Sequence, residues 1–150
     1  MSNSMPNSTK AMLWKAQIDA LNDTFKIILM QTGFVFDKDA HHCYADVSAY
    51  ELPTGNGYTA GGIDLTGVSV VVDDTEDRAE VGWNNAQWNA VGGTLVTSGA
   101  IIFDDDTDDG AGDDYTDAIV SYKDANGDIT ITDGTPIVVS SIMETLEDAV

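Results

Sequence analysis

The chain is poor in basic residues and has a single cysteine. Its 150 residues include six Lys and Arg against 26 Asp and Glu, which gives a formal net charge of −20. Long-range electrostatics at this charge oppose an approach to nucleic acid, anionic lipid or phosphorylated ligands, so these partners are excluded. The expected partner is basic, neutral or a metal cation. Because Cys43 is alone, the fold relies on no intrachain disulfide, which fits a chain made in a reducing cytoplasm.

Long apolar runs and a signal peptide are also missing. No stretch approaches the roughly 20 apolar residues needed to span a bilayer, and the opening MSNSMPNSTK has neither a basic start nor an apolar run. We therefore expect a soluble protein without a cleaved signal and without a membrane partner. The charge does not indicate disorder, because 43% of the residues are apolar and three Trp and five Tyr supply bulk for a core. This content suffices for one domain.

The two ends of the chain differ in composition from its middle. Residues 1–10 are polar, which predicts a flexible N-terminal arm, and residues 144–150 predict an acidic C-terminal tail. Between them, the apolar residues of 11–22 have spacings that fit a short helix, and 24–30 predict a buried strand. The expected folded domain is therefore residues 11–143.

From residue 45 onward the sequence is typical of an all-β chain. Short runs rich in Val, Ile and Thr alternate with clusters of Gly, Asp or Asn, and their alternation changes phase at Gly67, which indicates a bulge or kink. In residues 117–134 the pair Asn126 and Gly127 predicts a hairpin turn, because these residues readily take positive φ angles. Several such strands predict a single antiparallel β-sandwich or barrel.

Residues 54–62 read TGNGYTAGG, with four glycines in nine positions. A phosphate-binding loop needs Lys and then Ser or Thr after its last glycine, followed by a helix. Here Gly62 is followed by the strand-like run IDLTGVSV, and a dinucleotide-binding fingerprint fails for the same reason. The glycines are therefore predicted to turn the chain, with Tyr58 packed against the sheet that they border.

Several short segments occur in a recognisable order. DTFKIILM is followed by DVSAYE, GNGYTAGG and LTG, then by Trp88 at the end of a predicted hairpin, by GAIIF with an acidic loop behind it, and by a final hairpin. This series spans about residues 23–139 and resembles a widespread family of small tailed-phage virion proteins. The resemblance implies a non-enzymatic structural component of the particle with a β-sandwich-like fold.

Residues 103–117, FDDDTDDGAGDDYTD, contain eight aspartates. Carboxylate oxygens are the hard ligands that Ca²⁺ prefers, and the candidate ligands are Asp104, Asp106, Asp108 and Asp109. An EF-hand register that starts at Asp105 fails, because its last position falls on Thr116 and not on a glutamate. Two interpretations stay open, a solvated acidic loop and an irregular calcium site. No other cofactor is expected.

Three functional hypotheses follow. The favoured one is a capsid decoration (cement) protein, bound as a homodimer or homotrimer to the outside of the major capsid protein lattice. Such a protein is made in the cytoplasm of the host bacterium and ends on the capsid surface of the virion. The second is a tail, neck or tail-tip component of the same virion. The third is a Ca²⁺-dependent or carbohydrate-binding adhesion module. We expect no catalytic residues, because no nucleophile and base are plausibly held together.

Overall fold

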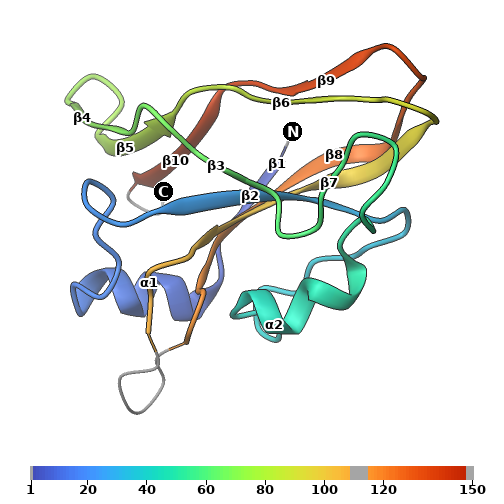
Figure 1. Cartoon of the computed structure of the whole chain (residues 1–150). Coiled ribbons are helices and arrows are strands. Elements are labelled where there is room, and N and C mark those ends of the chain that lie inside the picture. Colours follow the sequence, from blue (N-terminus) through green and yellow to red (C-terminus); the bar gives the residue numbers. More distant parts are fainter. Residues whose placement is uncertain (1, 109–114, 148–150) are drawn as a thin grey trace.

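The protein is an antiparallel β-sandwich with two short helices (Figure 1). The structure is a computed structural model that describes residues 2–108 and 115–147. One layer is a five-stranded sheet, and the other is built from a three-stranded and a two-stranded sheet. The all-β sandwich predicted from the sequence is confirmed. The two helices lie on opposite faces of the larger sheet (Figure 1). Met12 of the first helix packs in the core that the second layer covers, whereas Val47 of the second helix belongs to the cluster on the other face.

The larger sheet contains both the shortest and the longest strands. Every pairing in it is antiparallel. Its strands are, in spatial order, β1 (Ser2–Ser4), β8 (Ile119–Ile131), β7 (Leu95–Asp104), β2 (Phe25–Met30) and β3 (Ile63–Asp64).

The central strands of this sheet are buried on both faces. In β2, Ile27 and Leu29 belong to the core between the two layers, whereas Ile28 and Met30 belong to a second cluster on the opposite face. None of these four side chains is more than 1% exposed. A strand covered on both sides carries a continuous apolar run, and this explains why TFKIILM lacks a polar alternation.

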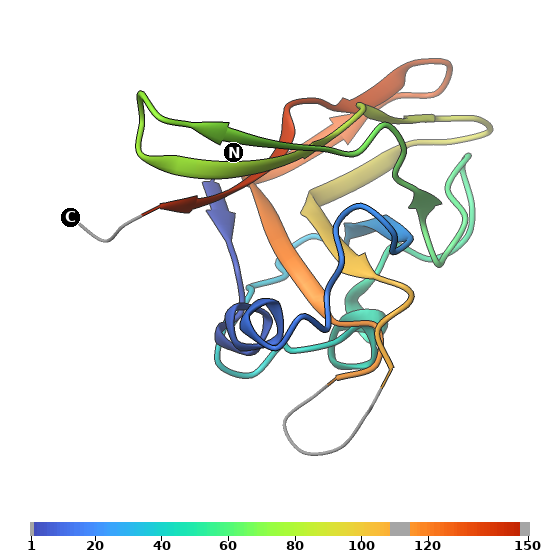
Figure 2. The same ribbon diagram turned by 90° about the vertical axis from the view of Figure 1, so that its left-hand side faces the viewer.

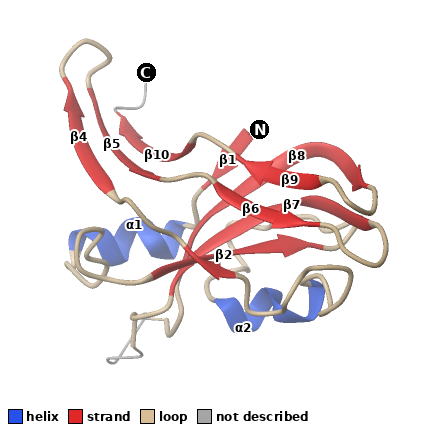
Figure 3. Ribbon diagram, turned by 45° about the horizontal axis from the view of Figure 1, so that its top comes forward, coloured by secondary structure: helices blue, strands red, loops and turns tan. Residues whose placement is uncertain are grey.

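The second layer is one long bent ribbon with an extra strand. The three-stranded sheet consists of β10 (Ile142–Glu147), β5 (Arg78–Trp83) and β4 (Ser69–Asp73), and the two-stranded sheet of β6 (Ala86–Asn89) and β9 (Pro136–Val139). The pairings Trp83–Ile142 and Ala86–Val139 have the same register. Strands β5 and β6 therefore follow one another along one side of a single antiparallel ribbon, and β9 and β10 along the other side. The ribbon bends at residues 84–85 and 140–141, between the two paired stretches (Figure 3).

The N-terminal residues are ordered, which corrects the prediction of a flexible arm for residues 2–10. Strand β1 pairs with β8, and α1 (Asn7–Trp14) follows at once. Within α1, the Thr9 hydroxyl donates to the carbonyl of Ile119, and the Met12 side chain is 1% exposed. A sheet edge orders a polar segment through main-chain hydrogen bonds, which need no apolar periodicity. The second helix, α2 (Tyr44–Val47), continues into a 3₁₀ turn at Ser48–Tyr50.

Two further predictions are corrected. Strand β8 continues through Asn126 and Gly127, which have φ angles of 58° and 130°. These residues form a bulge opposite β7, and not a hairpin turn, because positive φ angles serve either purpose. Residues 144–147 of the predicted acidic tail pair with β5 as part of β10, while 148–150 lie outside the described residues. The expected break at Gly67 is present between β3 and β4, with φ at 66°.

A buried ion pair joins the two layers. Lys123 of β8 contacts the Glu144 carboxylate of β10 and donates to the carbonyl of Met143 at 2.7 Å. The Ser121 hydroxyl donates to the same carboxylate at 2.6 Å, and both charged side chains are buried. A buried charge without its partner is strongly unfavourable. Because a shift of β10 relative to β8 would separate the two charges, the pair favours the observed position of β10 over the larger sheet.

Helix α1 offers a matched test of its docking. Met12→Ala removes a side chain that is 1% exposed, and we expect it to lower the free energy of unfolding by about 2–5 kcal/mol. Trp14→Ala, on the same helix, removes a side chain that is 92% exposed, and its effect should stay within about 0.5 kcal/mol. Urea unfolding of both variants measures the difference. Equal stabilities would mean that α1 is not docked as described.

Candidate functional site

The aspartates predicted to bind calcium take up different positions after β7. Asp104 is fully buried, while Asp106 and Asp108 are exposed, and Asp109 lies outside the described residues. Asp106 accepts the N–H of Thr24. Among residues 2–108 and 115–147, no group of three or more His, Cys, Asp or Glu side chains is placed to hold a metal ion. The calcium site therefore stays a prediction.

Asp104 is an unusual carboxylate. One of its oxygens accepts the N–H of Asp106 at 3.0 Å, and the other is buried without a hydrogen-bond partner. The pKa of Asp104 is raised to about 7, and burial is the largest cause. The negative charges of Asp23 and Asp106 act in the same direction, and the hydrogen bond from the N–H of Asp106 acts against them. The ionised form is therefore disfavoured in the folded protein.

The neighbouring His41, His42 and Cys43 do not converge on a common point. The ring of His41 accepts the N–H of Asp37 at 3.0 Å, whereas His42 stacks on Tyr115 with ring centres 4.6 Å apart. The Cys43 thiol faces the carboxylate of Asp46 at 3.4 Å. These partners account for the three side chains locally, and no shared ion is needed to explain their positions.

The glycine-rich segment is held by a buried glutamate. One Glu51 oxygen accepts the Tyr58 hydroxyl at 2.6 Å and the N–H of Gly61 at 2.7 Å, and the other accepts the Tyr44 hydroxyl at 2.6 Å. The Tyr58 oxygen in turn accepts the N–H of Leu29 at 3.1 Å. Residues 54–62 are thus pinned to strand β2, as the prediction of a packed Tyr58 requires.

Two glycines of this segment are required by close approach as well as by backbone conformation. Gly57 and Gly62 have φ angles of 91° and 70°. A Cβ at Gly57 would overlap the carbonyl of Asn89, and one at Gly62 would overlap the carbonyl of Ile27. The segment therefore lies directly on other strands, and no room is left there for a phosphate.

The same network perturbs its tyrosines. Burial, together with the hydrogen bond to Glu51 and its charge, raises the pKa of Tyr44 to about 12. Burial raises the pKa of Tyr58 even further, and Glu51 acts in the same direction. Both hydroxyls therefore stay protonated, and remain hydrogen-bond donors, far above neutral pH. We call Glu51 with Tyr44, Tyr58 and Gly61 the Glu51 clamp, because these contacts hold the segment in place.

The β4–β5 hairpin exposes apolar side chains. It extends to one side of the body together with β10 (Figure 2). In β4, the side chains of Val70, Val71 and Val72 are 50%, 50% and 73% exposed. Strand β4 is at the edge of its sheet, and in the described part of the chain no strand pairs with its outer side. An edge of this kind is a template for pairing with another chain.

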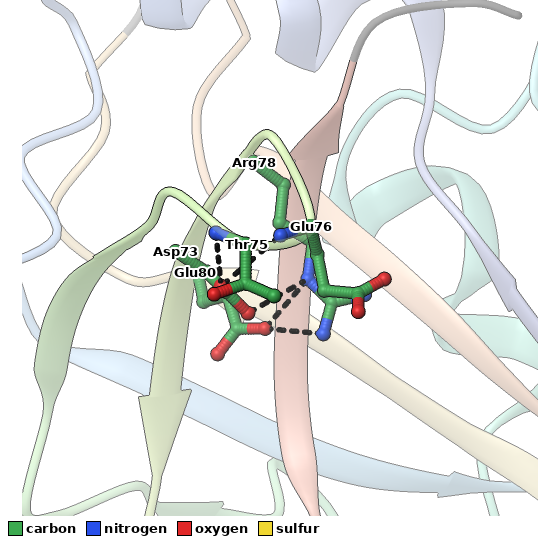
Figure 4. Close-up of polar contacts among 5 residues, drawn as sticks. All are labelled: Asp73, Thr75, Glu76, Arg78 and Glu80. Carbon is green, nitrogen blue, oxygen red and sulfur yellow. Dashed lines mark hydrogen bonds and ion pairs between the residues drawn. The ribbon is translucent and has the colours of Figure 1, made fainter.

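The turn of this hairpin is acidic and is held by polar contacts within the hairpin (Figure 4). The Asp73 carboxylate accepts the N–H groups of Thr75 and Glu76 at 3.0 and 3.2 Å. Arg78 forms an ion pair with Glu80 at 2.7 Å and lies 3.9 Å from Asp73. Residues 73–80 contain five acidic residues and one basic residue, and that basic residue is already paired within the hairpin. The turn therefore presents an excess of negative charge.

A groove separates the hairpin from helix α1. It has a volume of about 1340 Å³, and its walls include Leu13 and Trp14 on one side and Val72, Ala79 and Leu146 on the other. The strand register places these last three side chains next to one another across β4, β5 and β10. An apolar recess of about 150 Å³ lies beside the same elements. The larger groove also has charged residues in its lining, among them Lys10 on the helix side and Asp73, Asp74, Asp77 and Arg78 on the hairpin side. Exposed apolar surface that is rimmed by polar residues is typical of a binding site.

Comparison with protein-family models, with curated proteins and with solved structures finds no match to this chain. Within the described residues, no helix has the length and apolar character needed to cross a bilayer. The candidate functional site is therefore defined by the exposed apolar side chains and the groove that they line. It consists of the β4–β5 hairpin and the groove beside α1.

Sequence reasoning missed this surface. The alternating runs after residue 45 predicted strands of a sandwich, which gave no reason to expect exposed valines in 70–72. The short helix predicted within residues 11–22 was not expected to lie opposite them. The available signal was the run of three valines directly before Asp73 and Asp74, because side chains that alternate across a strand cannot all face one core. The topology, which places β4 at an edge, decides that this run is exposed.

The Glu51 clamp predicts that two matched substitutions lower the stability of the protein by different amounts. Tyr58→Phe removes the hydroxyl between Leu29 and Glu51 at a buried site, and we expect it to lower the free energy of unfolding by about 1–3 kcal/mol. Tyr44→Phe removes one hydrogen bond at a half-buried site, so its cost should be smaller. Urea unfolding at neutral pH compares them. A larger loss for Tyr44→Phe would contradict the described network.

Asp104 predicts a pH dependence of stability. Its folded pKa of about 7 lies above its ordinary value of 3.8, so its contribution is fully present below about pH 4 and is lost as the pH rises towards 7. We expect a decline with a slope of at most about 1.4 kcal/mol per pH unit. Asp104→Asn should flatten this decline, and Asp108→Asn, at an exposed position of the same loop, should not. Urea unfolding across this range measures both, and identical profiles would refute the assignment.

Proposed function

We propose that the protein is a non-enzymatic structural protein of a tailed-phage virion, and that it binds the outside of the major capsid protein lattice as a capsid decoration protein. The proposal rests on the resemblance over residues 23–139 and on one observation, the exposed apolar hairpin with its groove. Val70, Val71 and Val72 belong to neither of the two core clusters, so these valines are not among the residues that fill the cores.

The exposed side chains favour a binding role. Trp14, Val72 and Leu146 line one groove and are 92%, 73% and 50% exposed. A contiguous apolar surface is unfavourable in water and is usually covered in the working assembly. A tryptophan flanked by aliphatic groups is also typical of residues that contribute most to protein–protein binding. A partner that covers the groove would therefore account for its composition.

The charge favours a place on the outside of the head. A net charge of −20 repels packaged DNA and attracts a basic surface. Virion sites are symmetric, so copies of the chain are expected to bind as dimers or trimers around the symmetry axes of the lattice. A tail, neck or tail-tip position uses the same surface and differs in the number of copies.

The copy number distinguishes these positions. We expect quantitative mass spectrometry of purified virions to find the chain at hundreds of copies per particle, comparable to the major capsid protein. Particles that lack the protein should lose their DNA at a lower temperature than complete particles, and adding purified protein should restore them. A small copy number, as for a protein that forms a single ring, would place the chain in the neck or tail. Its absence from purified virions would refute the proposed function.

A further inference from the structure

We propose that the outer edge of β4 binds an extended, basic segment of a partner protein, which adds as a further antiparallel or parallel strand to the β10–β5–β4 sheet. The segment carries apolar residues at alternate positions and Lys or Arg beside them. This inference rests on the proposed function only for the partner's place in the virion, because the chemistry of the segment follows from the hairpin itself.

The first argument is that β4 lacks the features that protect edge strands. Proteins shield such edges with short strands, lysines, prolines, bulges or inward-pointing charges. The edges of the larger sheet follow this rule, since β3 has two residues and β1 is the polar Ser2–Ser4. Strand β4, by contrast, reads SVVVD and keeps a regular register with β5 along its whole length. Its outer main-chain groups are therefore free to pair with an added strand.

The second argument concerns the side chains that an added strand would meet. Val70 and Val72 lie on one face of β4, and Val71 on the other. The face of Val72 lines the groove opposite Leu13 and Trp14. Residues opposite one another on neighbouring strands share a face. Alternate side chains of the added strand would therefore point into the groove, and apolar ones would cover Val72 and the exposed Trp14.

The third argument is charge complementarity. Of the acidic residues in the turn, Asp74, Glu76 and Asp77 are exposed, whereas Arg78 is held by Glu80. Lysines or arginines in the added strand would lie next to this acidic turn and be attracted to it. A second copy of the chain has no such complement: residues 60–73, which contain β4, carry two acidic residues and no basic one. Self-pairing would also bring together two chains of net charge −20.

A designed peptide tests the inference on the isolated protein. The probe is an end-blocked heptapeptide of alternating lysine and valine, and its control alternates glutamate and valine. We expect the lysine peptide alone to bind, with an affinity that falls as salt is added, and to slow amide hydrogen exchange at residues 69–73. Binding of both peptides with equal affinity, or unchanged exchange at β4, would overturn the inference. So would protection of residues 69–73 that grows with protein concentration before any peptide is added, because a second copy would then be the occupant.

Matched variants separate the apolar from the electrostatic contribution. The double variant Val70→Ser, Val72→Ser should weaken binding of the lysine peptide by about tenfold, because each cross-strand pair contributes up to about 1 kcal/mol. The control, Val35→Ser with Val91→Ser, alters two valines that are 80% and 64% exposed and lie outside the hairpin, and it should bind as the wild type does. Asp74→Asn should reduce the salt dependence, and Asp128→Asn, at an exposed position of β8, should not.

The same double variant distinguishes this inference from the proposed function. If Val70→Ser, Val72→Ser occupies particles as fully as the wild type does, the strand-addition site is refuted while the decoration role stands. If the chain is absent from virions but binds the lysine peptide through β4, the decoration role is refuted and the site stands. Loss of both peptide binding and particle occupancy in this variant, with normal behaviour of the control, is the result that we expect.

Discussion

The burial of both faces of the β2–β7 pair is the constraint on which the rest of the structure depends. Alternate residues of these strands face two separate cores, so each face needs its own cover. The bent ribbon of β5, β6, β9 and β10 covers one face, and the segment around Phe34, α2 and Tyr44 contributes to the other. The Glu51 clamp belongs to the same arrangement, since Tyr58 binds the main chain of β2 directly.

The hairpin is notable against this background. A chain that buries apolar residues on both sides of its central sheet nevertheless leaves three valines of β4 and the ring of Trp14 in contact with water. Such exposure costs solubility and is seldom kept without a binding role. The acidic turn next to these valines limits which chains can approach, so the same hairpin supplies both the attraction and the selectivity. This combination is what the proposed role in assembly would require.

The sequence predicted the fold class and many strand positions, because continuous apolar runs and glycine breaks are local signals. The run 24–30 and the break at Gly67 are of this kind. Prediction from the sequence failed where the partner strand decides the local structure. Residues 2–4 are ordered by β8, residues 144–147 by β5, and the Asn126–Gly127 pair is a bulge because β7 lies opposite. The candidate site could not be predicted for the same reason: the exposure of the valines follows from the edge position of β4, and its other wall from the docking of α1.

The unbroken register between the β5–β10 and β6–β9 pairs has a mechanical consequence. A partner that pulls on the hairpin along its strands loads β5 and β10, and the ribbon carries this load into β6 and β9, where Trp88 and Ile137 are packed in the core. Hydrogen bonds in an antiparallel pair lie perpendicular to the strands, so a force along the ribbon strains many of them together instead of opening them one at a time. The buried Lys123–Glu144 pair adds a fixed point on β10 partway along this path. The projecting hairpin thus behaves as the end of a tether anchored deep in the sandwich, suited to holding two bodies together under tension.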